Sequence, residues 1–280
     1  MKDVAAREQR RRKLAREGGS VRYRARVEYD GTDFAGFQLQ PRARTVQGEL
    51  EAALSRLSAG RRARVHAAGR TDAGVHAAGQ VVAFEYGGLL SRAELGRALD
   101  ALLPPDVAVS ELRRAPRGFQ PRHAMRREYR YSIWNGPRSP LRERTSLGIR
   151  TPLDTEAMAR AATTLIGRHD FRALGGPVGR STVRRIERIT VRRHGRVVTI
   201  DVVADAFIRQ MVRAIAAALI RVGRGVASED EVAAALRQIG GRAFDGAVAP
   251  AKGLCLRKVV YGPRRDQGTR ERDRERKQER

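Results

Sequence analysis

Apolar and polar side chains follow two different periods along this chain of 280 residues. Residues 21–29 alternate apolar with charged side chains, which predicts a half-buried strand. Residues 45–57 place their apolar side chains at helical spacing, and Thr45 is positioned to cap that helix. Strands are predicted further on at 64–67, 80–86, 107–113, 128–134, 183–192, 196–204 and 254–261. Helices are predicted at 91–103, 154–166, 207–222 and 228–239, two of them opened by capping boxes, Ser91 with Glu94 and Ser228 with Glu231.

Strands interleaved with helices in both halves of the chain predict an α+β fold. We expect two similar α/β-sandwich halves, with mainly antiparallel sheets joined side by side around a central basic cleft. The halves are predicted at 21–135 and 154–263, with a connector at 136–153 that holds three prolines. The charged segments 1–20 and 264–280 contain almost no large apolar side chains and are predicted to be a disordered basic arm and a disordered tail.

The formal net charge of +26 indicates a polyanionic partner. The segments 1–20 and 264–280 carry only +4 and +3 of it, so +19 remains on the predicted folded body. Of the 57 basic residues, 52 are arginine, a bias that a GC-rich genome would also produce. A basic protein that binds membrane surfaces is an alternative, but the sequence shows no amphipathic anchor for it.

Several classes of protein and site are disfavoured by the sequence. The longest uninterrupted apolar run, 214–220, is too short to span a bilayer, and no secretory signal follows the N-terminus. The single cysteine, Cys255, permits neither an internal disulfide nor a cysteine-based metal site, and the five histidines lack metal-ligand spacing. No phosphate-binding glycine loop of the GxxxxGK[ST] type is present. We therefore expect a cytoplasmic protein without metal or small-molecule cofactor.

The segment 69–77, with sequence GRTDAGVHA, is the strongest candidate for chemistry. It places the carboxylate of Asp72 in a loop of small residues between two predicted strands, where a planar substrate could approach closely. Arg70 supplies a cation two residues earlier. The alternative is a tight turn in which the Asp72 side chain binds nearby backbone amides.

This loop resembles the signature loop of the tRNA pseudouridine synthase A family. Further segments resemble other motifs of that family, in the same order along the chain. They are Tyr29–Thr32 with Gly36–Gln38 and Gln40, Thr45–Gln47 with Glu49 and Leu50, Arg127–Tyr131, Asp170 and Phe171 with Thr182, Arg184 and Ile186, Phe207 with Met211–Arg213, and Ala249 and Pro250 with Gly253, Leu254 and Leu256.

The resemblance implies the pseudouridine synthase fold and an enzyme that isomerises uridine to pseudouridine in tRNA, at positions 38, 39 and 40 of the anticodon arm. It also implies a cofactor-free homodimer and a target base flipped out of its stack. Among catalytic residues, Asp72 matches the family aspartate, Tyr129 the tyrosine that stacks on the base, and Arg213 the cation paired with the aspartate. The carboxylate could attack the base or the ribose, or remove the 2′ proton, and the sequence leaves these routes open. Tyr129 could also help to remove the proton from C5.

Four more residues are implied to bind substrate. Arg70 matches the arginine thought to fill the gap left by the flipped base, although it could instead pair with Asp72. Leu254 matches the apolar residue under the uracil, although plain core packing would also explain it. Thr71 and His76 belong to the same loop motif and are included with them.

Departures from the family pattern occur at 119–124, Leu174 and Gln210, and none of them falls on the three catalytic positions. Two alternatives to the implied function remain. One is a synthase of this fold that modifies another RNA, and the other is an inactive RNA-binding or chaperone protein.

Overall fold

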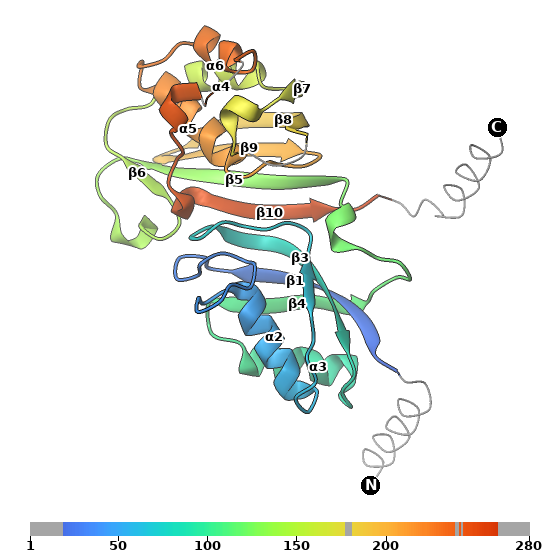
Figure 1. Ribbon diagram of the computed structural model, residues 1–280. Coiled ribbons are helices and arrows are strands. Elements are labelled where there is room, and N and C mark those ends of the chain that lie inside the picture. Colours follow the sequence, from blue (N-terminus) through green and yellow to red (C-terminus); the bar gives the residue numbers. More distant parts are fainter. Residues whose placement is uncertain (1–18, 177–180, 239–240, 242, 263–280) are drawn as a thin grey trace, which may run out of the picture.

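The computed structural model describes residues 19–176, 181–238, 241 and 243–262, and these form one large sheet with helices packed at both ends (Figure 1). Apart from residues 19 and 20, the predicted arm and tail lie outside the described residues. None of the described helices is long and apolar enough to cross a membrane.

The sheet has ten strands, of which eight follow one another in the order β4-β1-β3-β10-β5-β9-β8-β7, while β2 pairs with β3 and β6 with β5. Antiparallel pairing dominates, and among the described strands only the β10–β3 and β5–β6 pairs are parallel. This confirms the predicted α+β class with a mainly antiparallel sheet. The bounds of the strands are β1 Val21–Tyr29, β2 Val65–Ala67, β3 His76–Tyr86, β4 Val107–Arg114, β5 Arg126–Asn135, β6 Leu147–Ile149, β7 Gly167–Asp170, β8 Val183–His194, β9 Val197–Ala204 and β10 Leu254–Val260.

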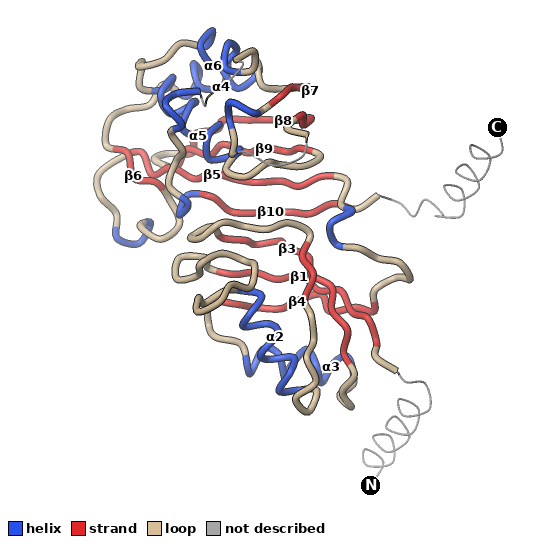
Figure 2. Tube along the Cα trace, in the orientation of Figure 1, coloured by secondary structure: helices blue, strands red, loops and turns tan. Residues whose placement is uncertain are grey.

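Helices cover the two ends of this sheet, as Figure 2 shows in blue. The pair α2 and α3 lies beside β1 and β4, and α4, α5 and α6 lie beside β7, β8 and β9 (Figure 1). The bounds are α2 Val46–Leu57, α3 Arg92–Leu102, α4 Thr155–Thr163, α5 Met211–Gly223 and α6 Glu229–Ala235, with short 3₁₀ turns at Pro121–His123, Pro140–Arg142, Arg172–Leu174, Ala243–Gly246 and Ala251–Gly253.

The predicted helix starts are confirmed wherever a side chain caps them. The Thr45 hydroxyl accepts from the Gly48 amide, and both capping boxes are present, at Ser91 and at Ser228. The prediction that a helix begins at 207 is wrong, because Gln210 has a left-handed φ of 63° and α5 starts only after it. The helix predicted to reach 239 is also shorter, since α6 ends at Ala235.

Strand β10 joins the early and late parts of the chain. It comes from the end of the described sequence but lies between β3 and β5, so one sheet and one apolar core run through the described molecule. A glycine permits this close insertion: a Cβ on Gly79 of β3 would lie 2.3 Å from the backbone oxygen of Arg257. The division into halves at 21–135 and 154–263 stays a prediction, and its connector holds the short strand β6.

Candidate active site

The loop between β2 and β3 presents Asp72 next to the centre of the sheet. Its base is held by the fully buried Gln80, whose Nε2 donates to the Gly69 oxygen at 2.8 Å. Its turn is closed by the Val75 amide, which donates to the backbone oxygen of Asp72 at 3.2 Å, and Gly74 takes a φ of 75° there. The turn is thus made by the Asp72 backbone, and the Asp72 side chain is 36% exposed and turned toward a cation.

A second loop, residues 30–44, supports the Asp72 loop from behind. The Phe37 amide donates to the Thr71 oxygen at 3.1 Å, and the Gly74 amide donates to the Phe34 oxygen at 3.3 Å. The contact is backbone against backbone, because a Cβ on Gly31 would lie 2.0 Å from the Val75 oxygen. Glycine is therefore required in the segment 29–40, because a side chain there would prevent the two loops from making backbone contact.

Arg213 is the cation that faces Asp72. It lies in the first turn of α5, where its side chain is 15% exposed, and its Nη1 is 3.9 Å from Asp72 Oδ2. Its Nε donates to the Ala249 oxygen at 2.7 Å, which fixes the direction of the guanidinium. At 3.9 Å the two groups attract each other by charge, at a separation longer than a hydrogen bond.

Tyr129 and Leu254 lie on β5 and β10, the two strands that follow β3 in the sheet. Tyr129 on β5 is 7% exposed, and its ring forms a T-shaped pair with that of Phe207 at a centroid distance of 5.1 Å. Burial raises the pKa of the Tyr129 phenol above its ordinary value; the charge of Arg127 opposes the rise and that of Asp72 adds to it. The phenol is therefore neutral at ordinary pH. Leu254, 6% exposed, begins β10 opposite Tyr131.

The other predicted binding residues are placed differently from one another. Arg70 is exposed, and no ion pair joins it to Asp72 in the described part of the chain. Thr71 is buried, with its Oγ1 2.7 Å from the Tyr29 hydroxyl. His76 is buried as well: its Nδ1 accepts from the Gly31 amide at 3.0 Å, and its Nε2 lies 3.2 Å from the Lys252 oxygen. Thr71 and His76 thus hold the loop in place from inside the protein.

Arg127 is a structural residue of the site to which the sequence assigned no role. Its guanidinium donates to three backbone oxygens, those of Ala68 at 2.8 Å, Asp205 at 2.9 Å and Arg122 at 2.9 Å. It thereby ties the start of the Asp72 loop to two distant segments. Nothing local predicts this, because the acceptors are backbone atoms brought together only by the fold.

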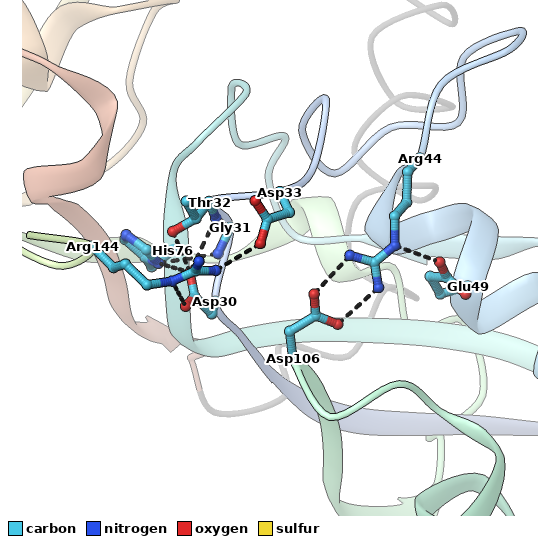
Figure 3. Close-up of polar contacts among 9 residues, drawn as sticks. All are labelled: Asp30, Gly31, Thr32, Asp33, Arg44, Glu49, His76, Asp106 and Arg144. Atoms are coloured by element: carbon cyan, nitrogen blue, oxygen red, sulfur yellow. Dashed lines mark hydrogen bonds and ion pairs between the residues drawn. The ribbon is translucent and has the colours of Figure 1, made fainter.

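Two further arginines bracket the supporting loop 30–44 (Figure 3). Arg144 from the connector donates to Asp30 at 3.0 Å and to Asp33 at 2.7 Å. Arg44 binds both carboxylate oxygens of Asp106 at 2.7 and 2.9 Å and Glu49 at 2.9 Å. These contacts fasten both ends of the loop on which the Asp72 turn rests.

The carboxylate of Asp30 is the centre of the first of these contacts. Although burial raises its pKa, hydrogen bonds from Thr32 and Arg144 outweigh burial and hold the pKa of Asp30 below its usual range. Asp30 is therefore an anion at neutral pH, as its contact with Arg144 requires.

The arrangement combines a reachable carboxylate, a fixed cation, a buried neutral phenol and an apolar side chain. Such a set can bind a planar, uncharged ring while placing one anion beside it. Among the residues that the structure describes, no group of three or more His, Cys, Asp or Glu side chains could hold a metal ion.

Comparison with known proteins identifies the family to which this arrangement belongs. The model of a family described as tRNA pseudouridine synthase matches residues 25–122 and 161–262. The chain belongs to the tRNA pseudouridine synthase family. As a member it is an enzyme of the isomerase class. Asp72 and Arg213 lie in the two matched stretches, whereas Tyr129 lies in the segment between them.

Curated relatives in this family cover most of the chain. It is 43% identical over 239 residues to a tRNA pseudouridine synthase A of Geotalea uraniireducens, an alignment that covers 84% of this chain and 97% of the relative. The relative of the same description from Pelobacter propionicus gives the same identity and coverage, and that from Moorella thermoacetica is 42% identical over 243 residues, again 84% of this chain and 97% of the relative. The resemblance to the tRNA pseudouridine synthase family noted in the sequence is thus confirmed.

Proposed function

We propose that this chain isomerises uridine to pseudouridine in tRNA, at positions 38, 39 and 40 of the anticodon arm, with Asp72 as its catalytic carboxylate. The names of the curated relatives support tRNA as the substrate. The three positions, and a target base that flips out of its stack, rest on the motif resemblance. We further propose that the enzyme acts in the cytoplasm as a homodimer without a cofactor.

The observation that carries the proposal is the approach of Arg213 to Asp72 at 3.9 Å, with Tyr129 close enough for the Asp72 charge to raise its pKa. These three residues come from segments far apart in the sequence, and Asp72 alone among them combines a negative charge with an exposure of 36%. The reaction breaks the bond between N1 and C1′ and forms one between C5 and C1′, while the C5 proton leaves and N1 gains one. A single carboxylate can carry out either proposed first step of this reaction, as a nucleophile or as a base that removes the 2′ proton.

The neighbours of Asp72 take complementary parts. Arg213 attracts the Asp72 carboxylate by charge. The Tyr129 ring stacks on the uracil, and Leu254 packs beneath it. Arg70, exposed at the entrance of the loop, occupies the space that the flipped nucleotide leaves, since a guanidinium can both stack on bases and bind phosphate.

The test is turnover of Asp72→Asn and Asp72→Ala on an unmodified tRNA transcript. We expect pseudouridine formation to fall by at least about a thousandfold, because the reacting carboxylate is removed. Affinity for tRNA should stay within about twofold of the wild type, since the arginines that bind phosphates are unchanged.

Asp100→Asn is the matched control, because Asp100 is an exposed carboxylate on α3. Its turnover should equal that of the wild type. Normal turnover in either Asp72 variant would remove Asp72 from the mechanism. A wild type that binds tRNA and forms no pseudouridine would contradict the activity itself.

A further inference from the structure

A basic pocket of about 190 Å³ lies beside the candidate active site but outside it. The connector 136–153 folds back there against the end of β5, next to the start of β10 (Figure 1). Trp134 of β5 supplies an aromatic wall, and Lys252 contributes from the turn before β10. The volume equals that of roughly six water molecules, which is room for one phosphate group with part of its sugar.

The charge of this pocket is unbalanced. Arg138, Arg142 and Arg150 line it, and Glu143 is the one acid among its described lining residues. Glu143 is already paired with Lys252. The three arginines therefore surround the space without a carboxylate of the lining to neutralise them, in contrast to Arg144 next to them in the connector, which binds two.

Unneutralised guanidinium groups around a cavity favour an oxyanion. Like charges held together repel one another until an anion enters, and guanidinium groups match phosphate with paired, charge-assisted hydrogen bonds. The Arg142 guanidinium lies 5.8 Å from the centre of the Trp134 ring, so an aromatic surface adjoins the charged one. Phosphate attached to a nucleoside is the ligand chemistry that fits both.

The pocket and the candidate active site share a piece of backbone. The Lys252 oxygen contacts His76 of the Asp72 loop motif at 3.2 Å, and Leu254 follows two residues later. Lys252 therefore belongs to the pocket lining and also contacts the loop motif that carries Asp72.

We propose that this pocket binds a backbone phosphate of the RNA strand that carries the target uridine. The inference rests on the proposed function, because it takes RNA as the substrate. It assigns to the connector a binding role that is separate from the chemistry at Asp72.

The first test uses Trp134 as a reporter, because it is the only tryptophan of the chain. The wild type is titrated with an unmodified tRNA transcript, and separately with inorganic phosphate at the same phosphate concentration. We expect tRNA to change the emission of Trp134 in a saturable way and phosphate alone to leave it unchanged. Equal responses to both would overturn the assignment to an RNA strand in favour of a free-phosphate site.

The second test removes the charge. In Arg138→Gln/Arg150→Gln we expect tRNA to bind about tenfold more weakly at low salt, and the slope of log affinity against log salt to fall by about 0.7–0.9, the amount for one phosphate. The rate at saturating tRNA should change less than twofold. The matched control is Arg92→Gln/Arg97→Gln, which removes the same charge from the exposed face of α3 and should alter the slope by less than half as much.

Three results would overturn the proposal. They are a salt slope equal to that of the control, a tRNA complex in which Trp134 emission is unchanged, and a variant whose only defect is an altered oligomeric state in sedimentation. Failure of the proposed function gives a different result. A wild type that forms no pseudouridine, yet shows the Trp134 response and the salt effect, would contradict the activity and still support the phosphate site.

Discussion

Tyr129 shows how burial sets the chemistry of a single side chain. The phenol lies against Phe207, almost without contact with water, and its pKa is raised above the ordinary value near 10. At neutral pH it is therefore an uncharged ring that can stack on a base. Any removal of the C5 proton by its oxygen would require the hydroxyl proton to leave at the same time. The ring and the hydroxyl of Tyr129 therefore have separate roles, stacking and proton transfer.

Substitution of Tyr129 by phenylalanine and by leucine separates those parts. We expect Tyr129→Phe to keep tRNA affinity within about twofold, because the ring remains, and to lose about a hundredfold in turnover if the hydroxyl handles a proton. Tyr129→Leu should weaken binding as well, by about the five- to hundredfold that one base stack contributes. The measurements are single-turnover rates and binding by fluorescence anisotropy.

The pH profile supplies a second check on Tyr129. Since its folded pKa is raised, no ionisation of this phenol should appear in the wild-type rate below about pH 10. A Tyr129→Phe rate equal to that of the wild type would exclude the hydroxyl, and equal affinities of the phenylalanine and leucine variants would exclude stacking.

At the scale of elements, the Asp72 turn rests on a loop that is itself fastened from outside. Arg144 of the connector joins two carboxylates of the loop 30–44, and that loop contacts the Asp72 turn by backbone hydrogen bonds. Side chains 52% and 61% exposed, as in the Arg144–Asp33 pair, contribute little to global stability. Their effect is on the position of one loop.

We expect Arg144→Ala to lower the rate at saturating tRNA about tenfold, because a small displacement of a reacting group is costly. The Michaelis constant should change less than twofold and the melting temperature by no more than a few degrees. Arg144→Lys should recover part of the rate through its remaining charge. Arg160→Ala breaks a similarly exposed ion pair, with Glu229 at 2.6 Å, and serves as the control. Equal rates for Arg144→Ala and this control would refute the positioning role.

The sequence predicted correctly those elements whose signals come from neighbouring residues. The strand β1 and the helices α2 and α3 follow from alternation, helical spacing and caps read from neighbouring residues. The short strands β6 and β7 carried too few residues for a period, and α5 begins late because of the backbone conformation of Gln210. The insertion of β10 between β3 and β5 is set by pairing between residues far apart, for which the sequence holds no local signal.

The candidate site divides in the same way. Asp72 and its loop were found from a compact motif, and the motif series placed Tyr129 and Arg213 with it. The supports at Arg127 and Arg144 were not found, because their partners lie far away in the sequence and are in part backbone atoms. The sequence therefore predicted the reacting residues, whereas the arginines that support their loop could be identified only from the fold.

At the scale of the whole molecule, the distribution of positive charge along the chain determines how RNA binding depends on salt. The segments 1–20 and 264–280 carry +7 of the formal +26, and the remainder belongs to the residues between them. Charges on the body are held around the active site and can contact the phosphates of an RNA bound there. Charges on the end segments add a long-range attraction, which salt screens. The body should therefore account for most of the salt dependence of tRNA binding and for all of the turnover.

A chain reduced to residues 21–263 tests this distribution of charge. We expect its tRNA affinity at 50 mM salt to be a few-fold lower than that of the full chain, because some long-range attraction is lost, and the difference to shrink toward 200 mM salt. Its rate at saturating tRNA should match the full chain, since Asp72, Arg213 and Tyr129 are retained. The measurements are binding across a salt series and single-turnover formation of pseudouridine. A collapse of the rate in the shortened chain would show that an end segment takes part in the reaction, and an unchanged affinity at low salt would show that the end charges do not meet the RNA.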